Sequence, residues 1–293
     1  MNIEQKRGYF MIYNTKLIQY ANGKCQLRFY SQDIHISDDI TEIMKDKRED
    51  TINNSDSVVT DPELLIYQSK NRTINKIYDI ARSNIWDYFG TFTLDPKKVN
   101  RQNYDDCLEA VNRFCRYLKD FYCPELSYLI IPELHKDGKS YHFHALLGNA
   151  LLLPVKEAIN PHTGEFITDS KGRYVYNVPD YIFGFCTVTR VQDNFAAIAY
   201  MTKYVTKELC DSTQGKHRYI VSKNVGRPFS SVAKLTQEEF NNMLIRPDLR
   251  ISFMKSLGQD EYKMQIIELD NLSDSILIGL KDRFVNFEEV DLY

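Results

Sequence analysis

The chain has 293 residues, of which 43% are hydrophobic and 26% are charged, enough for one domain with extensions or for two small domains. No apolar run approaches the roughly 18 residues that a membrane-spanning helix needs. Residues 1–10 lack the apolar stretch of a secretory signal, so we expect a cytoplasmic protein with no membrane partner. None of the six cysteines forms a CxxC pair, so the sequence suggests neither a zinc knuckle nor a thioredoxin-like site.

The charge is unevenly distributed along the chain. The net charge of −3 argues against a nucleic-acid-binding protein. However, residues 196–234 contain seven Lys or Arg and only two acidic residues, whereas residues 256–293 contain nine acidic and three basic residues. Local charge decides where a phosphate backbone can lie, so the middle of the chain is the candidate nucleic-acid-binding region.

The N-terminal part of the chain is predicted to be an extension, residues 1–83. It contains a β-hairpin at 9–31, a polar linker at 37–61 and a helix at 62–83. The dipeptide Asn22-Gly23 is typical of two-residue hairpin turns. Asp61 is the expected N-cap of the helix and Pro62 its first residue.

The middle of the chain is predicted to be an α+β domain at 84–232. Strands are predicted at 88–94, 127–136, 139–147 and 181–191, and helices at 104–121 and 194–209. This order indicates a central, largely antiparallel sheet with flanking helices. Residues 154–180 form an insertion rich in turn signals. The pattern weakens afterwards, and residues 233–293 are predicted to be an acidic C-terminal extension.

The first candidate site is the pair His142 and His144. Two histidines separated by one residue on a strand point to the same face, so their imidazoles can bind one metal ion. If the chain turns tightly at 137–138, Glu133 faces His142 across the hairpin. Two imidazoles and one carboxylate make a site with open positions, suited to a divalent ion that polarises a substrate.

Two residues leave details of this site open. Pro132 has no N–H group, so its strand is either an edge strand or contains a bulge, which would shift the register by one residue. His135 would lie on the metal-facing side in the unshifted register. The alternative for His135 is an exposed histidine at the end of the strand.

The second candidate site is a run of two tyrosines and two lysines in the predicted helix at 194–209. Spacings of three, four and seven residues place Tyr200, Lys203, Tyr204 and Lys207 on one helical face. A phenol attacks only when its proton is removed, and a nearby ammonium favours the phenolate and neutralises a phosphate. The alternative is a solvated lysine face with tyrosines packed at its margin.

Three motifs together resemble the HUH replication initiators, in their order and rough spacing. They are Phe89-Gly-Thr-Phe-Thr-Leu-Asp95, His142-Phe-His144 followed by Ala-Leu-Leu, and Tyr200-x-x-Lys203-Tyr204-x-x-Lys207. The first is similar to the hydrophobic Thr-Leu-Thr strand of the family, although Phe92 stands where many relatives have Leu. The third looks like the two-tyrosine form of microvirus-type phage initiators and some plasmid relatives. The resemblance covers residues 84–229.

The resemblance implies an HUH/RRM-like nuclease fold and a nickase that forms a 5′-phosphotyrosine and leaves a free 3′-OH. The implied roles are metal ligands for His142, His144 and Glu133, nucleophile for Tyr200, phosphate partner for Lys203 and second tyrosine for Tyr204. The implied cofactor is Mg²⁺ or Mn²⁺, and the substrate is single-stranded origin DNA. Because no GxxxxGK[ST] motif is present, a bacterial host would supply the helicase as well as the polymerase.

Other basic residues and other functions complete the expectations. Phosphate contacts are expected from Lys207, Arg218, Lys223 and Arg227, with a solvated basic loop as the alternative. Thr91 is either a site-lining residue or an ordinary strand threonine. The competing functions are a relaxase or transposase of the same superfamily, a DNA-binding regulator that does not cleave, and a structural zinc protein. The origin sequence, plasmid or phage ownership and the oligomeric state stay open.

Overall fold

The computed structural model describes residues 10–21, 23–37, 62–213, 215–247, 249–258, 263–270 and 285–287. By its contacts the chain divides into two units, one of residues 60–227 and one that joins residues 1–59 to residues 228–293. The nuclease domain predicted at 84–232 was delimited by motifs instead of contacts, and its boundaries stay a prediction. The two units are referred to below as the central unit and the terminal unit.

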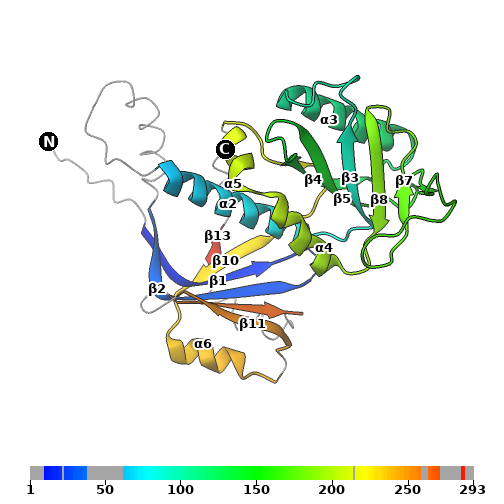
Figure 1. Cartoon of the computed structure of the whole chain (residues 1–293). Helices are drawn as coiled ribbons and strands as arrows, with labels where there is room; N and C mark the ends of the chain where they lie inside the picture. Colours follow the sequence, from blue (N-terminus) through cyan, green and yellow to red (C-terminus); the bar gives the residue numbers. More distant parts are fainter. Residues whose placement is uncertain are drawn as a thin grey trace, which may run out of the picture. The chain divides into compact units, whose positions relative to one another are not determined.

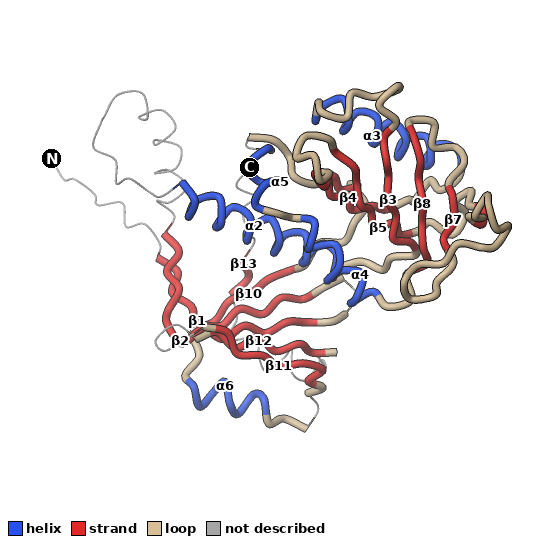
Figure 2. The backbone as a smooth tube through the Cα atoms, viewed as in Figure 1, coloured by secondary structure: helices blue, strands red, loops and turns tan. Residues whose placement is uncertain are grey.

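The sheet of the central unit carries the candidate metal ligands. Its strands are β3 (Tyr88–Leu94), β4 (Ser127–Leu134), β5 (Tyr141–Gly148), β6 (Lys156–Glu157), β7 (Val175–Asn177), β8 (Gly184–Arg190) and β9 (Ile220–Val221). They lie in the order β6-β7-β8-β3-β5-β4-β9, and every neighbouring pair is antiparallel. The longer strands are drawn side by side in Figure 2. The predicted α+β class with an antiparallel sheet is therefore confirmed, and the insertion at 154–180 contributes β6 and β7 to the sheet.

The helices of the central unit include both long helices predicted from the sequence. They are α2 (Pro62–Arg82), α3 (Tyr104–Phe121), α4 (Asn194–Met201), the 3-10 turn η1 (Thr202–Tyr204) and α5 (Lys207–Ser212), labelled in part in Figure 1. The start of α3 is set by Asn103, whose side chain accepts hydrogen bonds from the first backbone N–H groups of the helix. None of the helices that the structure describes combines the length and apolarity needed to cross a bilayer.

Side chains of β3 alternate between the two faces of the sheet, as the pleat requires. The even-numbered residues are buried, and Phe92 packs edge-on against Phe114 of α3 with ring centroids 5.7 Å apart. Phe89 points to the opposite face, where its ring lies 5.3 Å from that of Tyr200 at the end of α4. One face of the sheet therefore packs into the α3 core, and the other face holds the candidate tyrosines.

The single helix predicted at 194–209 is wrong. After α4 the helix tightens into η1, and the chain leaves helical geometry at Val205, with φ −83° and ψ 83°. Thr206 then caps α5 by accepting a hydrogen bond from the backbone N–H of Leu209. Valine and threonine are β-branched, and threonine is a strong N-cap, so a new helix starts here. Lys207 begins that helix, so the four residues of the tyrosine motif do not share one continuous helical face.

The terminal unit is built from strands at both ends of the described chain. It contains β1 (Phe10–Gln19), β2 (Cys25–Ser37), β10 (Phe229–Ala233), β11 (Ile251–Leu257), β12 (Met264–Leu269), β13 (Val285–Phe287) and helix α6 (Gln237–Leu244). The order is β11-β12-β2-β1-β10-β13, and every neighbouring pair is antiparallel. The predicted hairpin is confirmed as β1–β2, and Gly23 in its turn has φ 81°. The predicted linker lies outside the described residues, except for Ser37.

Helix α6 provides the core of this second sheet. It begins with a capping box, in which Thr236 and Glu239 each bind the other's backbone N–H. Phe240 is fully buried and stacks on Phe29 of β2, with ring centroids 4.2 Å apart. The weak pattern after Pro228 therefore folds into strands and a helix that complete a sheet begun by the N-terminal hairpin.

Candidate metal centre and tyrosine site

The β4–β5 hairpin has the pairing register predicted from the sequence. Glu133 lies opposite His142, and Ile131 lies opposite His144. No bulge occurs at Pro132, and β9 pairs only with the first half of β4 among the residues that the structure describes. Pro132 therefore sits where its missing N–H disturbs no ladder. The register places the carboxylate and both imidazoles on one face of the sheet.

The turn of this hairpin is longer than predicted. The strands end at Leu134 and Tyr141, and the hairpin closes with a bond of 2.8 Å from the His135 N–H to the Ser140 carbonyl. The Asp137 carboxylate holds the loop by accepting bonds from the Ser140 N–H and hydroxyl and from the N–H of Lys139. These bonds hold the pKa of Asp137 well below its usual value. The four-residue loop preserves the register because it adds one residue to each side.

Three ligand atoms converge on one point of the sheet. The Nε2 atom of His142 lies 2.6 Å from Oε2 of Glu133, and the Nε2 atom of His144 lies 2.7 Å from the same oxygen. The two Nε2 atoms are 3.0 Å apart. Two ligands that each lie about 2.1 Å from a metal ion at a right angle are about 3.0 Å from each other. The donor set and its spacing therefore fit a divalent ion held by these three residues.

The electrostatic environment keeps both imidazoles neutral, as ligands must be. Burial lowers the pKa of His144 to about 4, although its hydrogen bond to Glu133 acts in the opposite direction. Burial also lowers the pKa of His142, again against the attraction of Glu133. At neutral pH the two Nε2 atoms thus offer lone pairs when the proton of each ring is on Nδ1.

Two neighbours orient His144. Its Nδ1 lies 3.3 Å from the hydroxyl of Thr91 on β3, which can accept the Nδ1 proton and so leave Nε2 free to bind an ion. The ring of Tyr204 stacks on the imidazole, with centroids 3.6 Å apart and planes 12° from parallel. A ligand fixed on two sides loses little freedom when it binds a metal ion.

The two tyrosines of the motif have different environments. The side chain of Tyr200 is 46% exposed, whereas Tyr204 is only 9% exposed and lies between Phe89 and His144. Burial raises the pKa of Tyr204 well above its usual value, and a hydrogen bond to Tyr200 adds to the effect. The two rings meet edge-on with centroids 5.3 Å apart. Tyr200 is therefore accessible to a strand of DNA, and Tyr204 is part of the packing around His144.

The lysines of the motif also differ. The exposed side chain of Lys203 places its ammonium 4.9 Å from the centre of the Tyr200 ring. Lys207 is exposed too, but it begins α5 on the far side of the break at Val205. Only Lys203 thus stands beside the exposed phenol.

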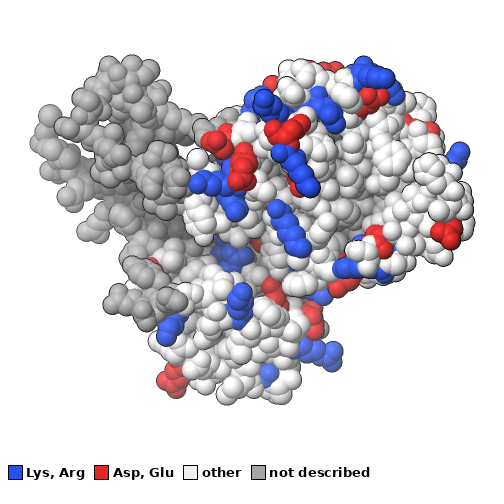
Figure 3. Space-filling view, in the orientation of Figure 1, with Lys and Arg blue, Asp and Glu red and all other residues white. Residues whose placement is uncertain are grey.

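The remaining basic candidates divide into buried and exposed residues. The guanidinium of Arg218 donates hydrogen bonds to Ser69 and Thr73 of α2 and to the carbonyl of Cys210 in α5, and so joins the two helices. Lys223 and Arg227 follow β9 and are exposed. On the face shown in Figure 3, Lys and Arg side chains are scattered among acidic and uncharged ones. DNA contacts of all four basic candidates stay a prediction.

His135 and Phe89 extend the site beyond the predicted residues. The ring of His135 is half-buried beside that of His142, with centroids 4.4 Å apart, instead of being exposed at the strand end. Phe89 contacts the rings of His144 and both tyrosines. Sequence reasoning missed Phe89, although its position two residues from Thr91 places both on one face of β3.

Comparison with known proteins places this site inside a family match. Residues 87–209 match a family model described as Replication-associated protein ORF2. The match begins just before β3, ends within α5, and includes the three candidate ligands and both tyrosines. No curated protein and no solved structure gives a significant match to the chain. Over residues 87–209, the chain is therefore similar to replication-associated proteins of the ORF2 type.

Proposed function

We propose that this protein is a rolling-circle replication initiator of the HUH type. It nicks single-stranded DNA at an origin through Tyr200, forms a 5′-phosphotyrosine, leaves a 3′-OH, and can rejoin the strand. The observation that carries the proposal is the convergence of Glu133, His142 and His144 beside an exposed tyrosine, within the segment that matches a replication-associated family. The bacterial cytoplasm is the proposed location, and a host helicase and polymerase are the proposed partners.

The three converging residues would hold the ion, with Thr91 and Tyr204 fixing the orientation of His144. When bound, Mg²⁺ or Mn²⁺ supplies positive charge that neutralises the scissile phosphate and polarises its bond to the 3′-oxygen. The neutral state of both imidazoles at physiological pH supports this role. A closed structural zinc site is disfavoured because the three ligands leave positions open.

Tyr200 is the proposed nucleophile because it is the exposed tyrosine of the pair. Its Oη forms a bond to phosphorus while the bond from phosphorus to the 3′-oxygen breaks. The phenol loses its proton and the departing 3′-oxygen gains one, so the exchange consumes no water. One phosphodiester replaces another, which lets the same site rejoin the strand. Lys203 is placed to pair with the negatively charged phosphate beside the ring of Tyr200.

Tyr204 has a different proposed role at the start of the reaction. Its stacking on His144 and its raised pKa both disfavour attack in this conformation. A second cut by Tyr204, as the two-tyrosine motif predicts, would require the side chain to leave this stack. Lys207, Lys223 and Arg227 are exposed and available to position the DNA backbone. For Arg218, which joins two helices, a phosphate contact would have to share its guanidinium.

A covalent-capture assay tests the proposal. The protein is mixed with Mn²⁺ and labelled single-stranded oligonucleotides tiled across its own replicon, and adducts are separated on a denaturing gel. We expect a shifted band that requires metal and is absent with Tyr200→Phe. Tyr174→Phe is the matched control, because Tyr174 is 54% exposed and lies in the insertion. If the folded wild-type protein forms no adduct with any oligonucleotide, the nickase is excluded and a non-cleaving DNA-binding protein becomes the better explanation.

A further inference from the structure

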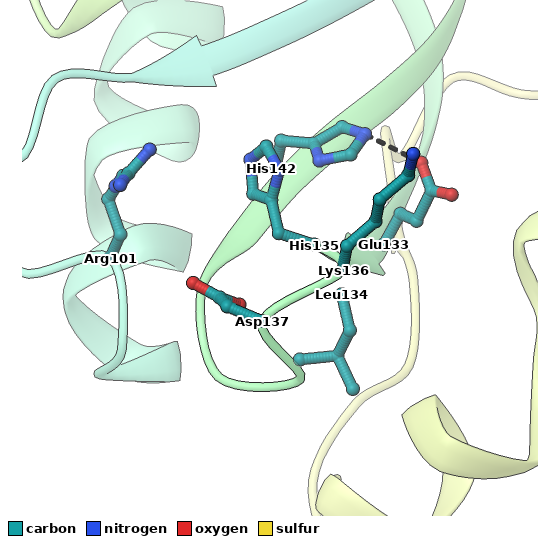
Figure 4. Close-up of a pocket in the computed structure, with 7 residues that line it drawn as sticks. All are labelled: Arg101, Glu133, Leu134, His135, Lys136, Asp137 and His142. Atoms are coloured by element: carbon teal, nitrogen blue, oxygen red, sulfur yellow. Dashed lines mark ion pairs between the residues drawn. The ribbon is translucent and has the colours of Figure 1, made fainter.

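A pocket of about 420 Å³ opens beside the candidate metal group (Figure 4). Its volume is within the range of about 300–1,000 Å³ typical of small-ligand sites. The residues around it include Arg101, Glu133, His135, Lys136, Asp137 and His142. Figure 4 shows the side chain of Arg101, from the loop before α3, reaching toward the histidine rings of the hairpin. Two of the ligand residues form one wall, so the pocket is continuous with the metal group.

The pocket and the tyrosines lie at opposite ends of a row of rings. Along the row, successive centroids are 5.3 Å apart from Tyr200 to Tyr204, 3.6 Å to His144, 4.8 Å to His142 and 4.4 Å to His135. The pocket is lined by the last two rings and by neither tyrosine. The metal group, in the middle of the row, therefore separates the exposed phenol from the pocket.

The pocket contains two cations available for a ligand. Among the residues that the structure describes, none forms a hydrogen bond or ion pair with the guanidinium of Arg101 or the ammonium of Lys136. The one acid besides Glu133, Asp137, directs its carboxylate to the N–H groups and hydroxyl of its own turn. The Nε2 atom of His135 is buried and has no partner among the described groups. These donors match an anion that also carries hydrogen-bonding groups, as a nucleotide does.

The geometry of phosphoryl transfer decides which nucleotide enters. The attacking and leaving oxygens lie roughly in line on opposite sides of phosphorus. With Tyr200 on one side of the metal group, the leaving 3′-oxygen points to the other side, toward His142 and the pocket. Resting on the proposed function, we propose that this pocket binds the nucleotide 5′ to the scissile phosphate, which becomes the 3′-OH end after cleavage.

This assignment gives the pocket a role in rejoining. After the cut, the 5′-phosphate stays on Tyr200, and only non-covalent contacts retain the other end. Arg101 and Lys136 would hold the phosphates of that end. Its 3′-oxygen can then attack the phosphotyrosine, forming the bond to phosphorus as the bond to Tyr200 Oη breaks. The 3′-OH loses its proton and the phenol regains one.

The test compares the two DNA products of cleavage. The probes are two six-nucleotide oligonucleotides from the cleaved strand, one ending in the 3′-OH at the nick and one beginning with the 5′-phosphate. Their binding to Tyr200→Phe protein is measured by fluorescence anisotropy, with Arg101→Ala or Lys136→Ala added. We expect each added change to weaken binding of the 3′-OH probe about tenfold, since a charge-assisted hydrogen bond is lost, and to leave the 5′-phosphate probe almost unaffected. Rejoining should fall in the Tyr200 background, while covalent capture at saturating DNA should persist.

Lys97→Ala is the matched control, an exposed cation in the same loop before α3 but outside the pocket. Unchanged binding of the 3′-OH probe, in variants that retain the wild-type circular dichroism spectrum, would overturn the assignment while the nickase stands. Equal weakening of both probes would also overturn it, because that result indicates general attraction to phosphate. If wild-type protein forms no adduct, the nickase and the pocket assignment fail together.

Discussion

The central unit and the terminal unit are both antiparallel sheets with helices, but they are assembled differently. In the central unit the metal ligands lie on two consecutive strands joined by a four-residue loop, β4 and β5. In the terminal unit β1 pairs with β10, so that Thr15 lies opposite Ala233. Local pairing costs little loop entropy and can be inferred from turn signals, whereas pairing over such a separation leaves no local signal. The comparison predicts that chemistry and fold stability can be perturbed separately.

The largest effect is expected from removing a metal ligand in the central unit. His142→Ala should lower the rate of covalent capture by about a thousandfold or more, because several kcal/mol of transition-state charge stabilisation depend on the ion. It should also weaken Mn²⁺ binding in isothermal titration calorimetry. The thermal unfolding of the protein should change little, since His142 is partly exposed and Glu133 still pairs with His144. Sharp unfolding on chelation would point instead to a structural metal.

The next effect is on the terminal unit and should leave the chemistry unchanged. Phe240→Ala removes a fully buried ring that stacks on Phe29, so the free energy of unfolding of this unit should fall by about 3–5 kcal/mol. Urea unfolding followed by circular dichroism measures the loss. Mn²⁺ affinity of the folded protein should equal that of the wild type. A matched loss of metal binding would show that the two units do not behave independently.

A smaller effect should separate the two tyrosines. Tyr204→Phe keeps the ring that stacks on His144, so covalent capture in a first round should fall less than about tenfold. Tyr204→Ala removes the stack and should weaken Mn²⁺ binding by about 10–100-fold, the range for partners that orient a ligand. The titration with Mn²⁺ alone distinguishes these cases. Equal metal affinity in Tyr204→Ala would show that the stack does not position His144.

The smallest effect is expected in the turn that sets the ligand register. Asp137→Ala removes three hydrogen bonds within the loop and should lower the melting temperature modestly at neutral pH. In the wild type these bonds lower the pKa of Asp137 from 3.8, so their stabilisation is complete above that value and is lost as the pH falls through the lowered pKa. The difference in melting temperature between variant and wild type should therefore shrink in acid. A constant difference across pH would contradict this account of the turn.

Several features of the site were determined by the sequence alone. The period of two along a strand places His142 and His144 on one face, and the turn signal at 137–138 sets Glu133 opposite His142. The register tolerated an error in turn length, because one extra residue on each side keeps the same pairs together. The Asn22-Gly23 dipeptide located the β1–β2 hairpin by the same kind of local rule.

Tertiary structure alone decided the rest, because the deciding contacts join segments far apart in the sequence. The motif treats Tyr200 and Tyr204 alike, but packing of η1 against β3 and β5 buries one ring on His144 and leaves the other exposed. The pocket depends on a loop residue, Arg101, that no motif includes. Likewise, the strands after Pro228 are too weakly patterned to predict, and burial of α6 against β2 fixes them in a sheet begun by the N-terminal hairpin.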